Sequence, residues 1–227
     1  MPYIPFPCAF MKCLSSFLSA SFGLAFLSGC ATPLGHPYNV TAYKPHNPND
    51  VRVKVSLSKQ NVYVMEGDRC LLAAATCVGT AQKPTPKGNF RVYQKIPDKR
   101  SSSYGFRVQG DRVVGAQAGD PIPGRYVGYP MPFWCEFAPA YGFHSGYVHP
   151  FPKTHGCLRL EKSVAPKFYE LLRIGTPVDI ATTQPEDATI GPKVQRPTDY
   201  KDPDPPAGYM VSSRVFQKPQ GPLLIEQ

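Results

Sequence analysis

Charged residues are scarce in this sequence. Only 18% of its 227 residues are Asp, Glu, Lys or Arg, a density too low for a disordered polycation. Long apolar runs are also missing, because the most apolar stretch, residues 11–30, is rich in serine and too short for a secure membrane span of about 20 apolar residues. The cysteines of the predicted folded part lack the spacing of a disulfide framework: Cys70, Cys77, Cys135 and Cys157. One of these thiols is therefore free to act as a nucleophile.

Proline, in contrast, is abundant, with 27 residues against a usual share of about 5%. Because each interior proline costs a helix about 3 kcal/mol, a helical bundle, coiled coil or helical solenoid is disfavoured. The hydrophobic share of 42% is enough for one core, which predicts a single domain with attached segments. The formal net charge of +9 admits three partners: nucleic acid, an anionic membrane surface or an acidic polymer outside the cell.

The N-terminal segment has the pattern of a secretory signal. After Met11 comes one lysine, then a largely apolar stretch that ends in small residues. The last four residues, Leu27-Ser28-Gly29-Cys30, resemble a bacterial lipobox, in which the cysteine is diacylated and becomes the first residue of the mature chain. We expect a signal peptide over residues 1–29, with translation starting at Met11, and a lipidated, extended tether over residues 30–50. Export of the chain removes nucleic acid from the expected partners.

Alternating polarity predicts strands in the middle of the chain. Four apolar residues between Val51 and Leu57 alternate with polar ones, which is the period of a half-buried strand. Turn residues after Met65 predict a hairpin with the segment that follows. Further strands are expected over residues 62–65, 70–78, 90–93, 131–137, 142–148 and 177–181. The predicted body is therefore rich in antiparallel β structure.

The remaining segments complete a mainly β architecture. Residues 97–130, rich in Gly, Ser and Pro, are expected to form a long loop rather than core strands. One helix is predicted after Ser163, where four apolar residues recur on one helical face before Gly175. We expect a β-sandwich or open barrel with one or two helices over residues 51–182. A proline-rich tail over residues 183–227 is expected to be disordered, or to lie along another surface.

Two short segments carry the residues of a thiol-based active site. A catalytic cysteine needs a base or a cation nearby, because a free thiol with a pKa of about 8.5 is mostly protonated at neutral pH. Cys157 follows Gly156, and a glycine before the nucleophile lets the backbone approach a substrate closely. His144, 13 residues before Cys157, is the candidate base, and His149, eight residues before it, is a rival.

These motifs resemble the signature of the L,D-transpeptidases of the bacterial cell wall. Residues 154–159 (THGCLR) match the family's Ser/Thr-His-Gly-Cys motif, its apolar residue and its arginine. Residues 143–146 (FHSG) resemble the family's His-Gly element, although Ser145 interrupts it. The resemblance covers residues 51–181. It departs from the family in spacing, because His144 lies a few residues closer to the cysteine than is usual.

The resemblance implies a two-step acyl transfer on peptidoglycan tetrapeptide stems, without a metal or cofactor. Cys157 would attack the carbonyl between meso-diaminopimelate and D-alanine. His144, oriented by the main-chain carbonyl of Ser145, would take and return a proton. The thioester would be resolved by an amine of a second stem, which forms a 3-3 cross-link, or by a lipoprotein lysine, which attaches a protein to the wall. Water as the acceptor would make the enzyme an L,D-carboxypeptidase.

The resemblance also assigns roles around the nucleophile. The amides of His155, Gly156 and Cys157 would hold the oxyanion, while Thr154 would contact substrate. Arg159 would position a substrate carboxylate or brace the site. The expected protein is a monomer, held in the cell envelope by its lipid and facing the periplasm. Ala31 after the lipidated cysteine favours the outer membrane.

Two other classes of protein stay open at this point. His144, His149, His155 and Cys157 lie within fourteen residues and could form a zinc site of a metallopeptidase or metal-binding lipoprotein. Against this, no Asp or Glu stands in the segment and no helical His-x-x-x-His motif exists. The second alternative is a catalytically silent lipoprotein that binds the wall.

Overall fold

The computed structural model of the protein describes residues 38–226. The predicted signal peptide, residues 1–29, the lipidation site Cys30 and the first part of the predicted tether lie outside the described residues. The part of the tether that is described packs on the folded body, where the Tyr43 amide donates to the Leu71 carbonyl at 2.9 Å. Among the described residues, no helix has the length and apolar character needed to cross a membrane.

The first sheet joins the beginning of the folded body to its last strand. Its order is β3-β2-β1-β10-β4, made of β1 (Val51–Ser56), β2 (Asn61–Glu66), β3 (Arg69–Ala75), β4 (Gly88–Arg91) and β10 (Pro177–Ala181). The alternation predicted for β1 is confirmed, because Val51, Val53 and Val55 are buried. Gly67, with φ of 58°, forms the predicted turn between β2 and β3. β10 pairs in parallel with β1, which places the last strand inside the sheet.

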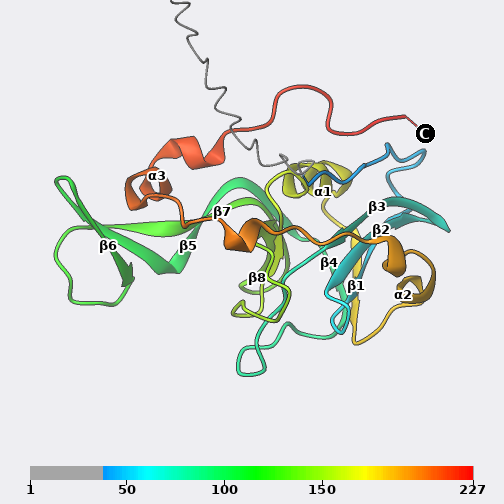
Figure 1. The fold of residues 1–227 in the computed structure, drawn as a ribbon, viewed down its shortest axis with the longest axis horizontal. Coiled ribbons are helices and arrows are strands. Elements are labelled where there is room, and N and C mark those ends of the chain that lie inside the picture. The colour runs from blue at the N-terminus through cyan, green and yellow to red at the C-terminus, as the bar shows by residue number, and fades with distance from the viewer. Residues whose placement is uncertain (1–37, 227) are drawn as a thin grey trace, which may run out of the picture. The chain divides into compact units, whose positions relative to one another are not determined.

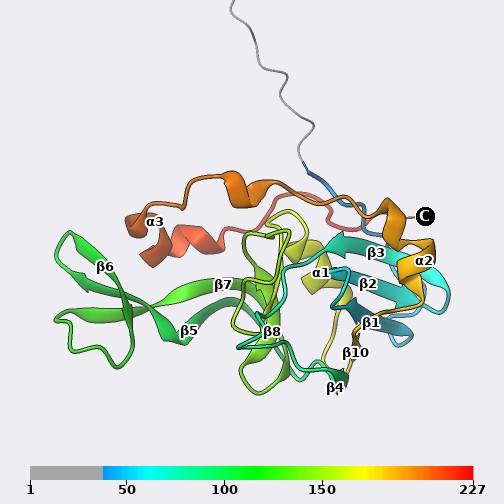
Figure 2. The same cartoon turned by 60° about the horizontal axis from the view of Figure 1, so that its bottom comes forward.

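Residues 97–130, expected to be a long loop, instead form most of the second sheet. Its order is β6-β5-β7-β8-β9, made of β5 (Gln94–Gln109), β6 (Arg112–Gln117), β7 (Arg125–Ala138), β8 (Tyr141–Ser145) and β9 (Leu158–Leu160). In Figures 1 and 2, β5, β6 and β7 form a long ribbon that extends away from β1, β2 and β3. The glycines allow close strand approach here. Gly105 pairs with Gly128, and a Cβ on Gly105 would lie 2.3 Å from the Val127 carbonyl oxygen.

The core contains residues from both sheets and from helix α1 (Ala165–Leu171), which confirms the predicted helix. Phe168 of α1 packs against Phe143 of β8, with 4.6 Å between ring centroids, and both side chains are fully buried. Burial of each such side chain contributes about 1.5–3 kcal/mol. The prediction of a mainly β fold with few helices is confirmed: two five-stranded sheets pack around one core. The packing of α1 on β8 supports the strand that carries His144.

Of the two alternatives expected for the C-terminal tail, residues 183–226 show the second, because the tail lies along the surface of the folded body. It contains α2 (Glu186–Thr189), α3 (Ala207–Val211) and three 3-10 turns, η1 (Gly191–Lys193), η2 (Asp199–Lys201) and η3 (Ser213–Phe216). Figure 2 shows the tail running from α2 above β7 to α3 beside the ribbon and then back. Near its end, Ile225 bridges to Tyr43. Polar contacts attach the tail to the folded body. The scarcity of large apolar residues in its sequence therefore did not reveal that it packs there.

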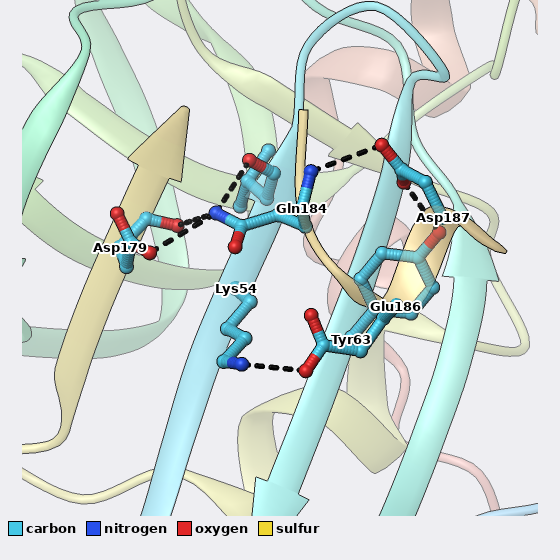
Figure 3. Close-up of polar contacts among 7 residues, drawn as sticks. Lys54, Tyr63, Asp179, Gln184, Glu186 and Asp187 are labelled. Carbon is cyan, nitrogen blue, oxygen red and sulfur yellow. Dashed lines mark hydrogen bonds and ion pairs between the residues drawn. The ribbon is translucent and has the colours of Figure 1, made fainter. Parts of the chain in front are cut away.

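A polar cluster at α2 makes the first of these attachments. The carboxylate of Asp187 accepts hydrogen bonds from the Ser56 hydroxyl of β1 (2.7 Å) and the Tyr63 hydroxyl of β2 (2.8 Å). Glu186 forms an ion pair with Lys54 at 2.5 Å. Figure 3 shows these carboxylates of the tail directed toward β1 and β2. Because these groups are largely removed from water, each bond that is lost leaves a partner unsatisfied.

Two further contacts hold the middle of the tail. The guanidinium of Arg100 on β5 donates to the Met210 carbonyl at 2.9 Å. The Asp199 carboxylate accepts a hydrogen bond from the Val148 amide at 3.2 Å, and burial raises the pKa of Asp199 to about 6. Val148 lies in the loop after β8. The tail therefore contacts the loop that follows the candidate base, His144.

We expect Asp187→Asn to destabilise the protein by about 1–3 kcal/mol. Asparagine keeps one acceptor oxygen, but its NH₂ group replaces the other. The hydrogen bond from one of the two hydroxyls is then lost. Equilibrium urea unfolding of the purified protein measures the change. Asp111→Asn, at an exposed position between β5 and β6, is the matched control and should change stability by less than about 0.5 kcal/mol. Equal stability of both variants would show that the cluster does not hold the tail.

Candidate active site

Strands β8 and β9 bring the two predicted segments together. His144 lies near the end of β8, and β9 begins directly after Cys157. The strands pair in parallel with His144 opposite Arg159. Paired residues of neighbouring strands share a face, so the His144 and Arg159 side chains point to the same side of the sheet. The short spacing between His144 and Cys157 is long enough for both residues to line one pocket.

A pocket of about 640 Å³ is lined by both Cys157 and His144. Three more predicted site residues line it: Thr154, His155 and Arg159. Its charged residues are Lys83, Lys99 and Arg159 against a single acidic residue, Glu136. The pocket therefore favours a ligand that carries carboxylates.

Cys157 is partly exposed in this pocket. Its sulfur lies 3.7 Å from the Ala140 carbonyl oxygen, which can accept the S–H proton. Burial raises the pKa of the Cys157 thiol, while the Gly142 backbone and the Arg159 charge act in the opposite direction. The resting nucleophile is thus a thiol at neutral pH, and its attack requires a base.

His144 has the properties of that base. The side chain is buried, and its Nδ1 lies 2.8 Å from the Ser145 carbonyl oxygen. Because a carbonyl oxygen only accepts, Nδ1 carries the proton and Nε2 is left as the acceptor. Burial, together with the nearby Arg159 charge, lowers the pKa of His144 to about 4, against the effect of the Ser145 contact. The imidazole is therefore neutral at pH 7 and able to take a proton.

In the turn before Cys157, two groups with predicted site roles make hydrogen bonds to the turn itself. The Thr154 hydroxyl donates to the Cys157 carbonyl (2.6 Å) and accepts from the Gly156 amide (3.1 Å). The Thr154 hydroxyl therefore helps to hold the turn, and the Gly156 amide already has an acceptor. The amides of His155 and Cys157 have no protein acceptor within residues 38–226. These two N–H groups are the ones left for an oxyanion.

Gly156 itself is required by geometry. Its φ is 109°, and a Cβ at this position would lie 2.4 Å from the Tyr141 ring. The glycine thus permits both the left-handed backbone and the close approach of β8. The His155 side chain lies at the pocket wall, 4.9 Å from the Tyr104 ring between centroids. Its position fits a structural role better than proton transfer to Cys157.

His149, the rival base, does not line the pocket of Cys157. It lines a second pocket of about 410 Å³, and its ring lies beside those of Phe151 and Tyr200. The second pocket shares Tyr129, His144 and Arg159 with the first one. Within residues 38–226, no group of three or more His, Cys, Asp or Glu side chains is arranged to hold a metal ion. Of the histidines that the zinc alternative invokes, His149 lies outside the pocket that His144, His155 and Cys157 line.

The described cysteines Cys70, Cys77, Cys135 and Cys157 are free, as expected from their spacing. Sequence reasoning missed Glu136 and Ala140, which line the same pocket as Cys157 and His144. A lone glutamate in the aromatic run 133–137 (FWCEF) was the available signal. A buried acid in such a run needs polar partners, and partners of this kind occur near functional sites.

Comparisons with known proteins identify the family of this chain. A model of the L,D-transpeptidase catalytic domain (YkuD) matches residues 50–180, more than half of the chain. Solved structures similar to the chain include an L,D-transpeptidase from Stackebrandtia nassauensis, with 22% identity, a TM-score of 0.44, and coverage of 63% of this chain and 60% of that one. Another is the L,D-transpeptidase from Mycobacterium smegmatis, with 15% identity, a TM-score of 0.45, and coverage of 58% of each chain.

The chain thus spans about three fifths of the length of these solved proteins. A search of curated proteins found no match. The family match rests on residues 50–180, a segment that contains both the Thr154–Arg159 motif and His144. This chain belongs to the L,D-transpeptidase catalytic domain family.

Proposed function

We propose that the protein is an L,D-transpeptidase that acts on peptidoglycan tetrapeptide stems through a thioester on Cys157. One observation carries the proposal: the Cys157 thiol and a buried, neutral His144 line a single basic pocket. A thiol with a raised pKa needs a base that is unprotonated at neutral pH, and His144 meets that condition. The excess of basic residues in the pocket suits a stem peptide, which carries carboxylates.

In the first step, the Cys157 sulfur attacks the carbonyl between meso-diaminopimelate and D-alanine. The thiol proton moves to Nε2 of His144, while the free amides of His155 and Cys157 stabilise the oxyanion. The carbon–nitrogen bond then breaks, and His144 returns the proton to the leaving D-alanine. The products are a thioester on Cys157 and free D-alanine.

In the second step, the amine of an acceptor attacks the thioester carbonyl. One proton of the amine passes to His144 and then to the departing sulfur, which restores the Cys157 thiol. An amine from a second stem gives a 3-3 cross-link, and a lipoprotein lysine attaches that protein to the wall. Arg159, which lines the pocket beside both catalytic residues, is placed to hold a substrate carboxylate.

Incubation of the purified protein with tetrapeptide muropeptides tests this function. We expect a thioester adduct on Cys157 by intact-mass spectrometry, release of D-alanine, and dimers that have lost one D-alanine. Tripeptides without dimers would identify water as the acceptor and make the protein an L,D-carboxypeptidase. Unchanged tetrapeptides with no adduct would refute the proposal, and this outcome is expected of a catalytically silent wall-binding protein.

The lipid anchor is a separate part of the proposal. We propose that Cys30, the last residue of the lipobox-like segment 27–30, is diacylated. Two acyl chains bind a bilayer stably. Ala31 favours the outer membrane, where the enzyme faces the periplasm. Cys30→Ala is expected to move the protein from the membrane pellet to the soluble fraction of a host with two membranes. Cys70→Ala, the matched control, should stay in the pellet. A pellet fraction unaffected by the Cys30 change would contradict the anchor.

A further inference from the structure

The carboxylate of Glu136 lies in the wall of the pocket that Cys157 and His144 line, and each of its two oxygens has its own partner. Glu136 belongs to β7 and is only 9% exposed. Its Oε2 accepts a hydrogen bond from Trp134 Nε1 at 3.0 Å, and its Oε1 accepts one from the Ala140 amide at 3.0 Å. Neither partner is itself a catalytic residue. Each of them, however, contacts one.

The first branch leads to the nucleophile. Ala140 has φ of 65°, a left-handed conformation that is uncommon for a residue with a side chain. The bond from its amide to Glu136 helps to hold this conformation, which turns the chain from β7 into β8. The carbonyl oxygen of the same residue lies 3.7 Å from the Cys157 sulfur. Glu136 therefore fixes the peptide that contacts the thiol.

The second branch leads to the base. The Trp134 ring is buried and lies 6.0 Å from the His144 ring between centroids, with an angle of 36° between the planes. On its other edge the indole packs against Gly142, where an added Cβ would lie 2.8 Å from the ring. The hydrogen bond from Nε1 to Glu136 fixes the rotation of the indole about its side-chain bonds. Glu136 therefore also fixes one wall of the His144 site.

We propose that Glu136 is a positioning residue that aligns Cys157 and His144 from one carboxylate, through Ala140 and Trp134. The inference rests on the proposed acyl transfer for its catalytic meaning. It predicts a second, electrostatic effect as well, because a negative charge beside the pocket disfavours a thiolate at Cys157. Positioning and charge can be separated, since different substitutions remove each of them.

Burial alone would raise the pKa of Glu136. The hydrogen bonds from Trp134, Tyr93 and Ala140, together with the Lys99 charge, instead lower it below its ordinary value. Glu136 is therefore ionised at neutral pH. Its charge acts on Cys157 in the direction that raises the pKa of the thiol. This contribution adds to the larger effect of burial, which also raises the pKa of the Cys157 thiol.

The test compares Glu136→Gln, Glu136→Asp and the control Glu170→Gln, an exposed glutamate on α1. The rate at which iodoacetamide alkylates Cys157 is followed from pH 5 to pH 10 by mass spectrometry of the Cys157 peptide. This reaction needs no transpeptidase substrate, so it is informative even if the proposed function fails. The rate of thioester formation with tetrapeptide is measured in parallel.

Glu136→Gln is expected to move the alkylation profile to lower pH by about half a unit or more, because one nearby negative charge is lost. It should also slow thioester formation by roughly tenfold to a hundredfold, because the amide group can accept only one of the two bonds. Glu136→Asp keeps the charge but is too short to reach both donors. It should slow thioester formation without moving the profile, and Glu170→Gln should change neither quantity.

Wild-type rates and an unmoved profile in Glu136→Gln would overturn the inference. An equal shift of the alkylation profile in Glu136→Asp would also overturn it. A looser site, rather than the lost charge, would then explain the shift in both variants. If Glu136→Gln does not fold, as thermal melting would show, Trp134→Phe removes the Nε1 donor, together with part of the ring, and keeps the Glu136 charge. Thioester formation at the wild-type rate in that variant would also overturn the inference. A wild-type protein that is alkylated but never acylated refutes the proposed function, and the shift in Glu136→Gln then still decides whether Glu136 controls Cys157.

Discussion

Cys157→Ala is expected to abolish acylation of the protein, both by tetrapeptide stems and by a carbapenem. A carbapenem contains a strained amide that a positioned thiol opens to a stable adduct, so intact mass reports the nucleophile directly. Removal of the sulfur removes the only group of the pocket that can form the thioester, and a loss of about 10⁴-fold or more is expected. Cys157→Ser should lose most of the activity too, since a hydroxyl is a weaker nucleophile next to the same base.

Cys70→Ala is the control for this result. Cys70 is also partly exposed but lies on β3, outside the pocket. Burial raises the pKa of its thiol. Cys70 does not line the pocket that contains His144. The Cys70 variant should form the adduct at the wild-type rate. An adduct in Cys157→Ala that is missing from Cys70→Ala would reassign the nucleophile.

His144→Asn is expected to lower the acylation rate by about 10²–10⁴-fold, the usual contribution of a positioned general base. Asparagine can still donate from its side-chain amide to the Ser145 carbonyl, so the variant keeps this contact of Nδ1 and loses the acceptor Nε2. His149→Asn is the matched control, because His149 lines the second pocket instead. A larger loss in His149→Asn than in His144→Asn would show that the base is assigned to the wrong histidine.

The pH dependence provides an independent check on His144. A protonated imidazole cannot take the thiol proton, so activity is lost as the pH falls through the pKa of the base. Burial lowers the pKa of His144 to about 4. The wild-type acylation rate should therefore hold as the pH falls from about 7 to about 5, whereas a base with an ordinary pKa of about 6.5 would be mostly protonated at the lower value. A midpoint near the ordinary value would show that His144 is solvated in the functional enzyme.

Local patterns predicted much of the first sheet and the helix. The alternation from Val51 to Leu57 and the apolar face around Phe168 each report burial within a few residues of chain, where period and burial are directly linked. Local patterns did not predict the ribbon of β5, β6 and β7. Gly105 and Gly128 resemble loop residues until their pairing across β5 and β7 is known. Close approach of two backbones is a relation between distant residues, and a local pattern does not contain it.

For a related reason, local patterns did not decide between the two alternatives for the tail. Its few apolar residues predicted disorder, because disorder is inferred from the lack of a face to bury. Asp187 instead accepts hydrogen bonds from Ser56 and Tyr63, which are more than a hundred positions earlier in the chain. A solvated aspartate and one that closes a long-range contact have the same sequence signature. Only the folded sheet supplies the partners.

The sequence by itself determined the chemistry: few charges, free thiols, and a Thr-His-Gly-Cys motif preceded by a histidine, which together predict a cysteine nucleophile with a base. The tertiary structure decided which groups can serve that chemistry. It placed His144 rather than His149 in the pocket of Cys157, used the Gly156 amide within the turn, and put Glu136 in the wall of the same pocket. The physical reason is that the kind of reaction a side chain can perform depends on its residue type. Its protonation state, and whether a backbone N–H is free to donate, depend on burial and on hydrogen-bond partners that only folding brings together.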